Sequence, residues 1–157
     1  MLKIAGVEIR TNDGHTEAYA LLRTLWRETT GRPFPQIART EKGKPYFPGE
    51  EFHFSITHTK HYAFCALSDR PVGIDAEELG RKIKPAIAGK ILSPGELEQY
   101  ENAEDKNKAL LTFWVLKEAQ AKCTGEGIRL HPNHTDFYLS DPRVQEYMGC
   151  LVAVIEG

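Results

Sequence analysis

Strand-like and helix-like hydrophobic patterns follow one another through the N-terminal part of the chain. Leu2 to Ile9 alternates loosely between hydrophobic and polar residues, which predicts a strand, and hydrophobic residues then recur at helical spacing from about His15 to Glu28. Residues 52–57 alternate more strictly, as a half-buried strand does, and Tyr62 to Leu67 predicts a further strand. This part therefore reads as strand, helix, strand, strand.

The C-terminal part contains more helical pattern between its strands. Val72 to Glu77 predicts a strand, Ile83 to Leu92 a helix, and about Asp105 to Cys123 a longer helix that Gly125 ends. The remaining elements are a short helix that begins with a capping box at residues 93–96, and two strands at residues 135–140 and 148–155.

The order of these elements predicts an α+β fold made of two similar α/β halves packed as a pseudo-dimer. The expected halves are residues 1–69 and 70–157, with the metal site in the second. The sequence shows no residue-level repeat, so the similarity of the halves is an expectation about their fold.

Composition narrows the class of protein. A chain of 157 residues with 41% hydrophobic residues can build a real core, and a net charge of −2 gives no general attraction to nucleic acid. Three widely spaced cysteines fit reduced thiols better than disulfides or a zinc site. The first ten residues lack the hydrophobic stretch of a signal peptide, and hydrophobic runs such as Leu151 to Ile155 are too short to span a bilayer. We expect a soluble, cytoplasmic protein without membrane or nucleic-acid partners.

Two short segments carry the candidate chemistry. In the predicted strand at residues 73–77, Asp75 and Glu77 are two residues apart and share one face. In the long predicted helix, Glu118 and Lys122 are one turn apart, on a face shared with Trp114. If they meet, these segments supply carboxylates for Mg²⁺ and an ammonium for phosphate oxygens, which are the parts that phosphoryl transfer needs.

Each of these signals has a simpler explanation when it is taken alone. Asp75 and Glu77 fit a solvated strand end, and Glu118 and Lys122 fit an ordinary helical ion pair that contributes about 0.3–0.5 kcal/mol. A histidine such as His58 is equally common in core and surface positions. The functional interpretation therefore depends on the motifs occurring together.

The motifs occur in a recognisable order, and the chain resembles the 4′-phosphopantetheinyl transferases that activate peptide and polyketide synthases, the pseudo-dimeric single-chain type. The resemblance covers about Arg39 to Leu139. It rests on the segments Gly43-Lys44-Pro45, Phe54 to Thr59, Gly73 to Glu77, and Phe113 to Lys122, followed by Gly125 and Gly127.

The resemblance implies an enzyme that moves phosphopantetheine from coenzyme A to a serine of an apo acyl or peptidyl carrier protein and releases adenosine 3′,5′-bisphosphate. Asp75, Glu77 and Glu118 match the Mg²⁺ ligands of the family, and Lys122 matches the lysine that stabilises or protonates the leaving phosphate. The base that deprotonates the serine is left open between Glu118 and a metal-bound water. A fused pseudo-dimer is expected to work as a monomer.

Coenzyme A contacts are also implied by the resemblance. Lys44, Thr57, His58 and Lys117 fall at the matching positions. The N-terminal region is shorter than the family pattern, so nucleotide affinity is expected to depend on Arg23, Arg27 or Arg39, or on a different pose of the nucleotide. Glu126 stands where the family often has lysine.

Two other classes of function remain open. One is a non-catalytic protein that binds coenzyme A or a carrier on the same scaffold, and the weaker one is a metal-dependent phosphohydrolase. A basic run of Arg81, Lys82, Lys84 and Lys90 is either a solvated helix face or a docking surface for an acidic carrier.

Overall fold

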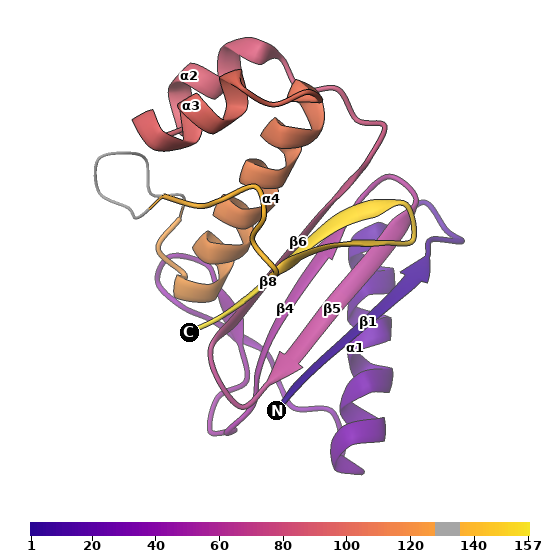
Figure 1. Cartoon of the computed structure of the whole chain (residues 1–157). Helices are drawn as coiled ribbons and strands as arrows, with labels where there is room; N and C mark the ends of the chain where they lie inside the picture. The colour runs from indigo at the N-terminus through magenta and orange to yellow at the C-terminus, as the bar shows by residue number, and fades with distance from the viewer. Residues whose placement is uncertain (128–135) are drawn as a thin grey trace.

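Two antiparallel sheets of three strands form the framework of the protein, and they share one strand order (Figure 1). The computed structural model describes residues 1–127 and 136–157. The first sheet has the order β1-β5-β4 and the second has the order β6-β8-β7. In each sheet the strand that comes last in the sequence therefore lies in the middle. The strands are β1 (Leu2–Glu8), β4 (His53–His58), β5 (Tyr62–Ser68), β6 (Val72–Glu78), β7 (Val144–Tyr147) and β8 (Cys150–Glu156).

In the sequence, one long helix comes between the first and second strands of each three-stranded sheet. These helices are α1 (Gly14–Thr30) and α4 (Lys106–Thr124). The predicted α+β class is confirmed, and the repeated order agrees with two similar halves; a boundary at residue 69 stays a prediction.

The smaller elements are β2 (Ala38–Arg39), β3 (Pro45–Tyr46), a 3₁₀ turn (Pro85–Ile87), α2 (Ala88–Ile91) and α3 (Pro94–Glu101). Within the described ranges, no helix is long and hydrophobic enough to cross a membrane.

Helix ends follow the capping signals in the sequence. The Ser93 side chain accepts from the Glu96 amide, and the Glu96 carboxylate accepts from the Ser93 amide, which is the predicted capping box. Gly125 ends α4 in the left-handed conformation (φ 73°), as predicted. The predicted helix at residues 83–92 is shorter than expected, because only the 3₁₀ turn and α2 form there.

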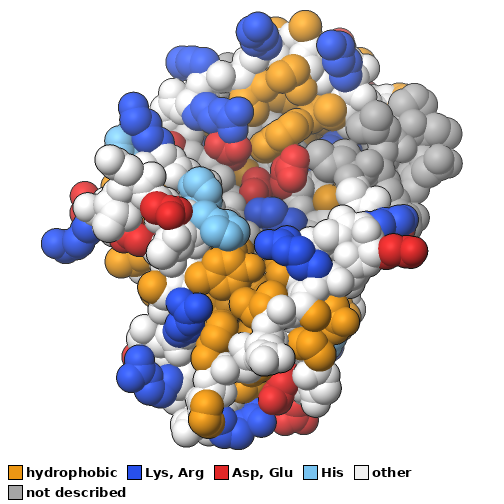
Figure 2. Space-filling model, turned by 180° about the vertical axis from the view of Figure 1, so that it is seen from behind, with side chains coloured by type: hydrophobic (Ala, Val, Ile, Leu, Met, Phe, Trp, Pro, Cys, Tyr) orange, Lys and Arg blue, Asp and Glu red, His pale blue; other side chains and the backbone are white. Residues whose placement is uncertain are grey.

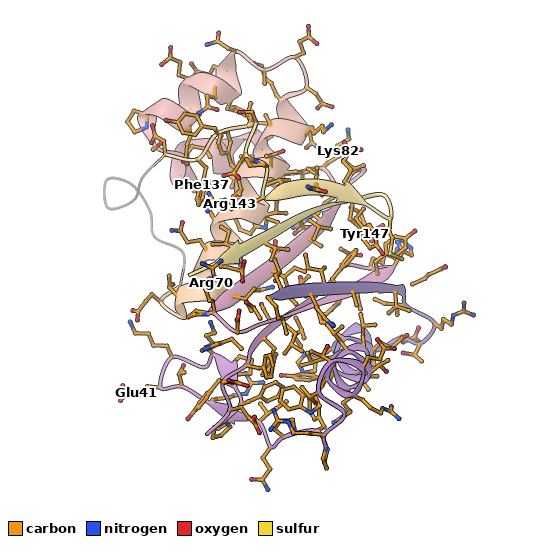
Figure 3. All side chains as sticks on the ribbon, turned by 60° about the horizontal axis from the view of Figure 1, so that its bottom comes forward. Glu41, Arg70, Lys82, Phe137, Arg143 and Tyr147 are labelled. Carbon is orange, nitrogen blue, oxygen red and sulfur yellow. The ribbon has the colours of Figure 1, made fainter. Side chains whose placement is uncertain are left out.

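The segment at residues 136–140 differs from the predicted strand. Residue 135 lies outside the described ranges, and residues 136–140 form no strand. Their amides bond to side chains of α3 instead of a sheet: Phe137 donates to Glu96 and Leu139 donates to Gln99. Phe137 and Arg143 lie close together in Figure 3, with the guanidinium 5.7 Å from the ring centre. β7 was not predicted, because its residues are mostly exposed and therefore lack a hydrophobic alternation.

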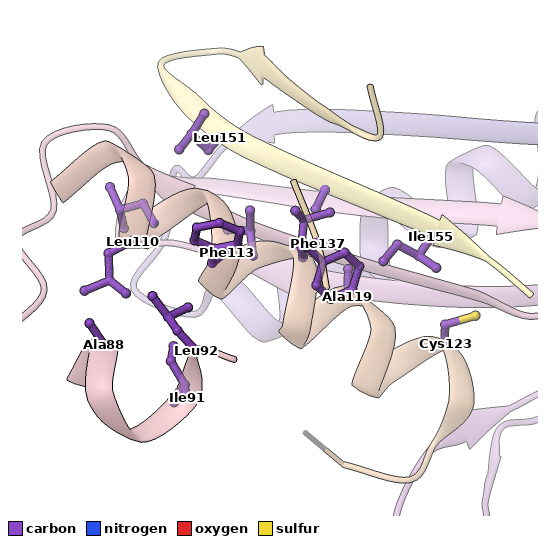
Figure 4. Close-up of a cluster of buried hydrophobic side chains, with 14 residues drawn as sticks. Ala88, Ile91, Leu92, Leu110, Phe113, Ala119, Cys123, Phe137, Leu151 and Ile155 are labelled. Atoms are coloured by element: carbon purple, nitrogen blue, oxygen red, sulfur yellow. The ribbon is translucent and has the colours of Figure 1, made fainter. Parts of the chain in front are cut away.

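Three groups of buried side chains form the core. One lies between α1 and the first sheet and includes Trp26 and Phe54, and a second lies between α4 and the second sheet (Figure 4). The third joins the two sheets through Phe64 on β5, Ile74 on β6 and Val152 on β8. Because this third group belongs to both sheets, burial of hydrophobic surface holds the two sheets together.

Gly73 allows α4 to cross β6 at very short range. A Cβ atom placed on Gly73 would lie 1.9 Å from the carbonyl oxygen of Ala119 and 2.5 Å from the amide nitrogen of Cys123. No real Cβ makes contacts that short, so this crossing requires glycine. The crossing brings the segment after Gly73 against the last turns of α4, where the candidate chemistry lies.

Candidate active site

Side chains bridge β4 and β6 where the two sheets meet. The two strands lie side by side but are edges of different sheets. The Ile74 amide donates to Ser55 Oγ over 3.0 Å, and Thr57 Oγ1 donates to Asp75 Oδ1 over 3.2 Å. Ser55 is buried and was not singled out from the sequence, because no local pattern reveals that its partner lies on another strand. These bonds fix Asp75 relative to β4.

Lys122 reaches this junction from α4. Its ammonium donates to the carbonyl oxygens of Ile56 (3.2 Å) and Ile74 (3.0 Å) and to Asp75 Oδ1 (3.2 Å). An ammonium has three N–H donors, so these acceptors match its full capacity. The predicted meeting of the strand motif and the helix motif is therefore present, with Lys122 as the contact between them.

Asp75 is a buried carboxylate whose two oxygens differ. Oδ1 accepts from Thr57 and Lys122, whereas Oδ2 is buried and has no hydrogen-bond partner. Burial raises the pKa of Asp75 to about 7, the nearby Lys122 opposes that rise, and the charges of Glu118 and Glu77 add to it. A buried oxygen without a partner, next to other carboxylates, is a site that favours a cation.

The other two predicted metal ligands are near Asp75 but face different partners. Burial raises the pKa of Glu118, with Lys122 lowering and Glu77 raising it. Glu77 forms an ion pair with Arg81. Among residues 1–127 and 136–157, no group of three or more His, Cys, Asp or Glu side chains is arranged to hold a metal ion. The donor chemistry fits Mg²⁺, which prefers oxygen ligands, but the three carboxylates do not form a closed cluster.

A cavity of about 570 Å³ opens beside Asp75 and Lys122. Its walls carry cationic and hydroxyl side chains, and Tyr19 and Phe54 contribute aromatic surface. Figure 2 shows histidine, basic and acidic side chains gathered in the middle of one face, above a hydrophobic patch. The polar residues in the lining include His15, Arg39, Lys42, Lys44, Thr57, His58, Asp75 and Lys122. An excess of positive charge over an aromatic floor suits an anionic ligand with a flat ring.

The structure places most of the predicted nucleotide contacts in this cavity. Lys44 is half-buried, and its ammonium donates to the Cys123 carbonyl at the end of α4 over 2.6 Å. Burial lowers the pKa of Lys44. Thr57, His58 and Arg39 also line the cavity, whereas Arg23 lies over the Phe34 ring. Of the three arginines considered from the sequence, Arg39 is the one in the cavity wall.

Lys117 requires a correction. The resemblance implied that Lys117 contacts coenzyme A, but its side chain is buried in the protein interior, with its ammonium 2.8 Å from the fully buried Glu96 carboxylate. The same carboxylate accepts from the amides of Ser93 and Phe137. A buried ammonium needs such a partner because desolvation otherwise disfavours its charge. The geometry thus gives Lys117 a structural role that links α4 to α3 and to the segment after residue 135.

Two charged features of the sequence have partners on the surface. Glu126, which stands where the family often has lysine, pairs with Lys42. Within the basic run, Arg81 is engaged with Glu77, while Lys82 and Lys90 are exposed. The charge that Glu126 introduces is therefore balanced by a lysine of the cavity wall.

Comparison with known proteins points to a single family. A family model described as the 4′-phosphopantetheinyl transferase superfamily matches residues 71–151, which include β6, α4 and most of the second sheet. The chain is 36% identical over 113 residues to the 4′-phosphopantetheinyl transferase psf-1 of Bacillus pumilus, covering 69% of this chain and 48% of that protein. It is 34% identical over 96 residues to a 4′-phosphopantetheinyl transferase of Bacillus subtilis, covering 57% of this chain and 41% of that one.

A third relative extends the comparison beyond Bacillus. A putative 4′-phosphopantetheinyl transferase of Haemophilus influenzae is 31% identical over 119 residues, covering 73% of this chain and 50% of that protein. The chain spans about half the length of the curated relatives it matches.

Proposed function

Because this chain belongs to the 4′-phosphopantetheinyl transferase superfamily, we propose that it transfers phosphopantetheine from coenzyme A to a serine of an apo carrier protein and releases adenosine 3′,5′-bisphosphate. The observation that carries the proposal is the meeting of β6 and α4, where Lys122 contacts Asp75 at the wall of a cationic cavity. Phosphoryl transfer depends mostly on positioning and on compensation of charge, and this arrangement offers both.

Coenzyme A would place its nucleotide in the 570 Å³ cavity. Lys44 and Arg39 would compensate the phosphate charge, His58 and the Thr57 hydroxyl would offer hydrogen bonds, and Tyr19 would offer surface for the base. The diphosphate would then lie toward Asp75 and Lys122. This pose accounts for the excess of cationic residues in the wall of a protein whose net charge is −2.

Asp75, Glu77 and Glu118 would hold a Mg²⁺ ion in the working enzyme. Such an ion would neutralise charge on the diphosphate. The unpartnered Asp75 Oδ2 and the mutual repulsion of the carboxylates support this assignment. To bind the ion, Glu77 would exchange its Arg81 partner for the metal.

In this proposal, Glu118 and Lys122 have different roles in the transfer. The serine hydroxyl attacks the phosphorus that bears pantetheine, and the bond from that phosphorus to the bridging oxygen breaks. Glu118 takes the serine proton, either directly or through a water that it polarises. Lys122 places a positive charge beside the leaving 5′-phosphate.

Incubation with coenzyme A, Mg²⁺ and a panel of apo carrier proteins tests the proposal. We expect intact-mass spectrometry to show a phosphopantetheine adduct on at least one carrier. Binding of coenzyme A without transfer to any carrier would instead support the non-catalytic alternative. The panel should contain carriers of fatty acid, polyketide and peptide synthesis, because the proposed reaction does not determine which carrier the enzyme recognises. Size-exclusion chromatography of the active preparation tests the expectation that the protein works as a monomer.

A further inference from the structure

The Thr57 hydroxyl on β4 is bonded within the protein. Thr57 is only 7% exposed, and its Oγ1 donates to Oδ1 of Asp75 on β6 over 3.2 Å. Ser55 lies two residues earlier, on the same face of β4, and its Oγ accepts from the Ile74 amide of β6. Both hydroxyls on this face of β4 are therefore used in contacts with β6.

The bond to Asp75 restricts what Thr57 can offer a nucleotide. A hydroxyl has one proton to donate, and the oxygens of an ionised phosphate are acceptors that need donors. While its proton lies on Asp75, Thr57 can only accept, as it would from a ribose hydroxyl. His58 is the next residue on β4, and its exposed side chain lines the same cavity without a bond to Asp75. The geometry thus gives these two neighbours different roles.

Thr57 and Lys122 both bond to the same oxygen of Asp75. Lys122 Nζ and Thr57 Oγ1 each lie 3.2 Å from Oδ1. The two donors come from α4 and β4, so Oδ1 is held from two separate elements. Oδ2 is buried and has no hydrogen-bond partner, which is costly for a carboxylate unless a cation compensates it. The bonds at Oδ1 therefore leave Oδ2 as the oxygen available to a cation.

We propose that Thr57 is a positioning residue, which holds Asp75 in the orientation where Oδ2 can bind the metal ion. This inference rests on the proposed function, which places the ion at Asp75. Hydrogen-bond partners behind a metal ligand fix its orientation, and their loss typically lowers metal affinity by about 10- to 100-fold. Thr57 belongs to the first sheet and Asp75 to the second. The affinity for the ion therefore depends on how the two sheets meet.

Three variants separate the hydroxyl from other effects. Thr57→Val replaces the hydroxyl with a methyl group, and Thr57→Ser keeps the hydroxyl and removes the methyl group. Thr112→Val is the matched control, because Thr112 is also buried and its hydroxyl donates to the Lys108 carbonyl within α4, outside the cavity wall. Urea denaturation of each variant shows that the protein is folded under the conditions of the binding experiments.

Metal binding is the direct measurement. Mn²⁺ is a suitable probe because it takes the same oxygen ligands as Mg²⁺, and electron paramagnetic resonance measures free Mn²⁺ in the presence of saturating coenzyme A. We expect Thr57→Val to weaken Mn²⁺ binding by about tenfold or more, and Thr57→Ser and Thr112→Val to change it by less than about twofold. Normal affinity in Thr57→Ser would identify the hydroxyl as the cause. Wild-type affinity in Thr57→Val would overturn the inference.

Binding of coenzyme A in a chelator separates positioning from direct contact with the nucleotide. Without metal, we expect Thr57→Val to change the calorimetric Kd by less than about twofold, and His58→Ala to raise it by about tenfold. Equal losses in the two variants would show that Thr57 contacts the nucleotide, and would also overturn the inference. Failure of the wild type to bind coenzyme A or Mn²⁺ would instead contradict the proposed function.

Discussion

The Lys122 ammonium donates to the Asp75 carboxylate with 3.2 Å between Nζ and Oδ1, although the two residues are 47 positions apart in the sequence. The same ammonium also binds the carbonyl oxygen of Ile56 on β4. One side chain of α4 therefore contacts both strands where the two sheets meet. Because this contact depends on how closely α4 approaches β6, the geometry of the site depends on residues that carry no chemistry themselves.

Gly73→Ala should separate α4 from β6. The new methyl group would lie 1.9 Å from the Ala119 carbonyl oxygen, so the helix has to move. We expect the free energy of unfolding to fall by about 1–3 kcal/mol or more, as for other overpacked sites, with a loss of transfer activity. Urea denaturation measures the first effect. Gly89→Ala is the control, because its methyl group meets nothing within 4 Å. An unchanged urea midpoint for Gly73→Ala would contradict the close crossing.

Lys117→Met tests the structural role assigned to Lys117. The substitution leaves the Glu96 carboxylate buried without its ammonium partner, which typically costs about 3–5 kcal/mol. We expect a large drop in stability, with the affinity for coenzyme A unchanged at temperatures where the variant is folded. Calorimetric binding and thermal unfolding separate the two effects. Weaker coenzyme A binding with normal stability would instead support a direct contact between Lys117 and coenzyme A, as inferred from the sequence.

Ser55→Ala should weaken the junction of the two sheets. The Ile74 amide would lose its acceptor in a buried position, and an unsatisfied buried donor costs about 1–3 kcal/mol. Hydrogen exchange at the Ile74 amide should become faster, since the bond that protects it is gone. Ser140→Ala is an exposed control. Exchange at the wild-type rate would show that the Ser55 hydroxyl does not hold β6.

Asp75 gives the metal-free protein a distinctive pH dependence. Burial raises its pKa from 3.8 to about 7, so the folded state holds the proton more tightly than the unfolded state does. This contribution to stability is complete below about pH 4, decreases as the pH rises toward 7, and is lost above that value. Urea denaturation across this range, in the presence of a chelator, should show the decline in the wild type. Asp75→Asn should lack it, and an identical slope in both proteins would refute the raised pKa.

Local signals in the sequence were enough to predict much of the fold. The strand before α1, the capping box at Ser93 and the stop at Gly125 all depend on neighbouring residues, and the structure has them. The meeting of Asp75 with Lys122 was also anticipated, because the two motifs occur together. These are features for which a few adjacent residues decide the conformation.

Other features depend on partners far along the chain. α4 has buried residues on several sides, so its hydrophobic pattern does not say which way Lys117 points, and its partner Glu96 lies on another helix. Ser55 is recognisable as part of the site only when β6 is seen beside β4. The sequence therefore could not predict that Lys117 faces the core while the adjacent Glu118 faces Asp75 and Glu77.

Transfer by matched glutamate variants tests the central claim most directly. Glu118 is half-buried beside Asp75, whereas Glu104 is exposed in the turn before α4. With coenzyme A, Mg²⁺ and an accepted apo carrier, we expect the wild type and Glu104→Gln to form the phosphopantetheine adduct at similar rates. Glu118→Gln should be slower by about 100-fold or more, in the range found for loss of a general base, with an unchanged far-ultraviolet circular dichroism spectrum. Full activity of Glu118→Gln would contradict the account.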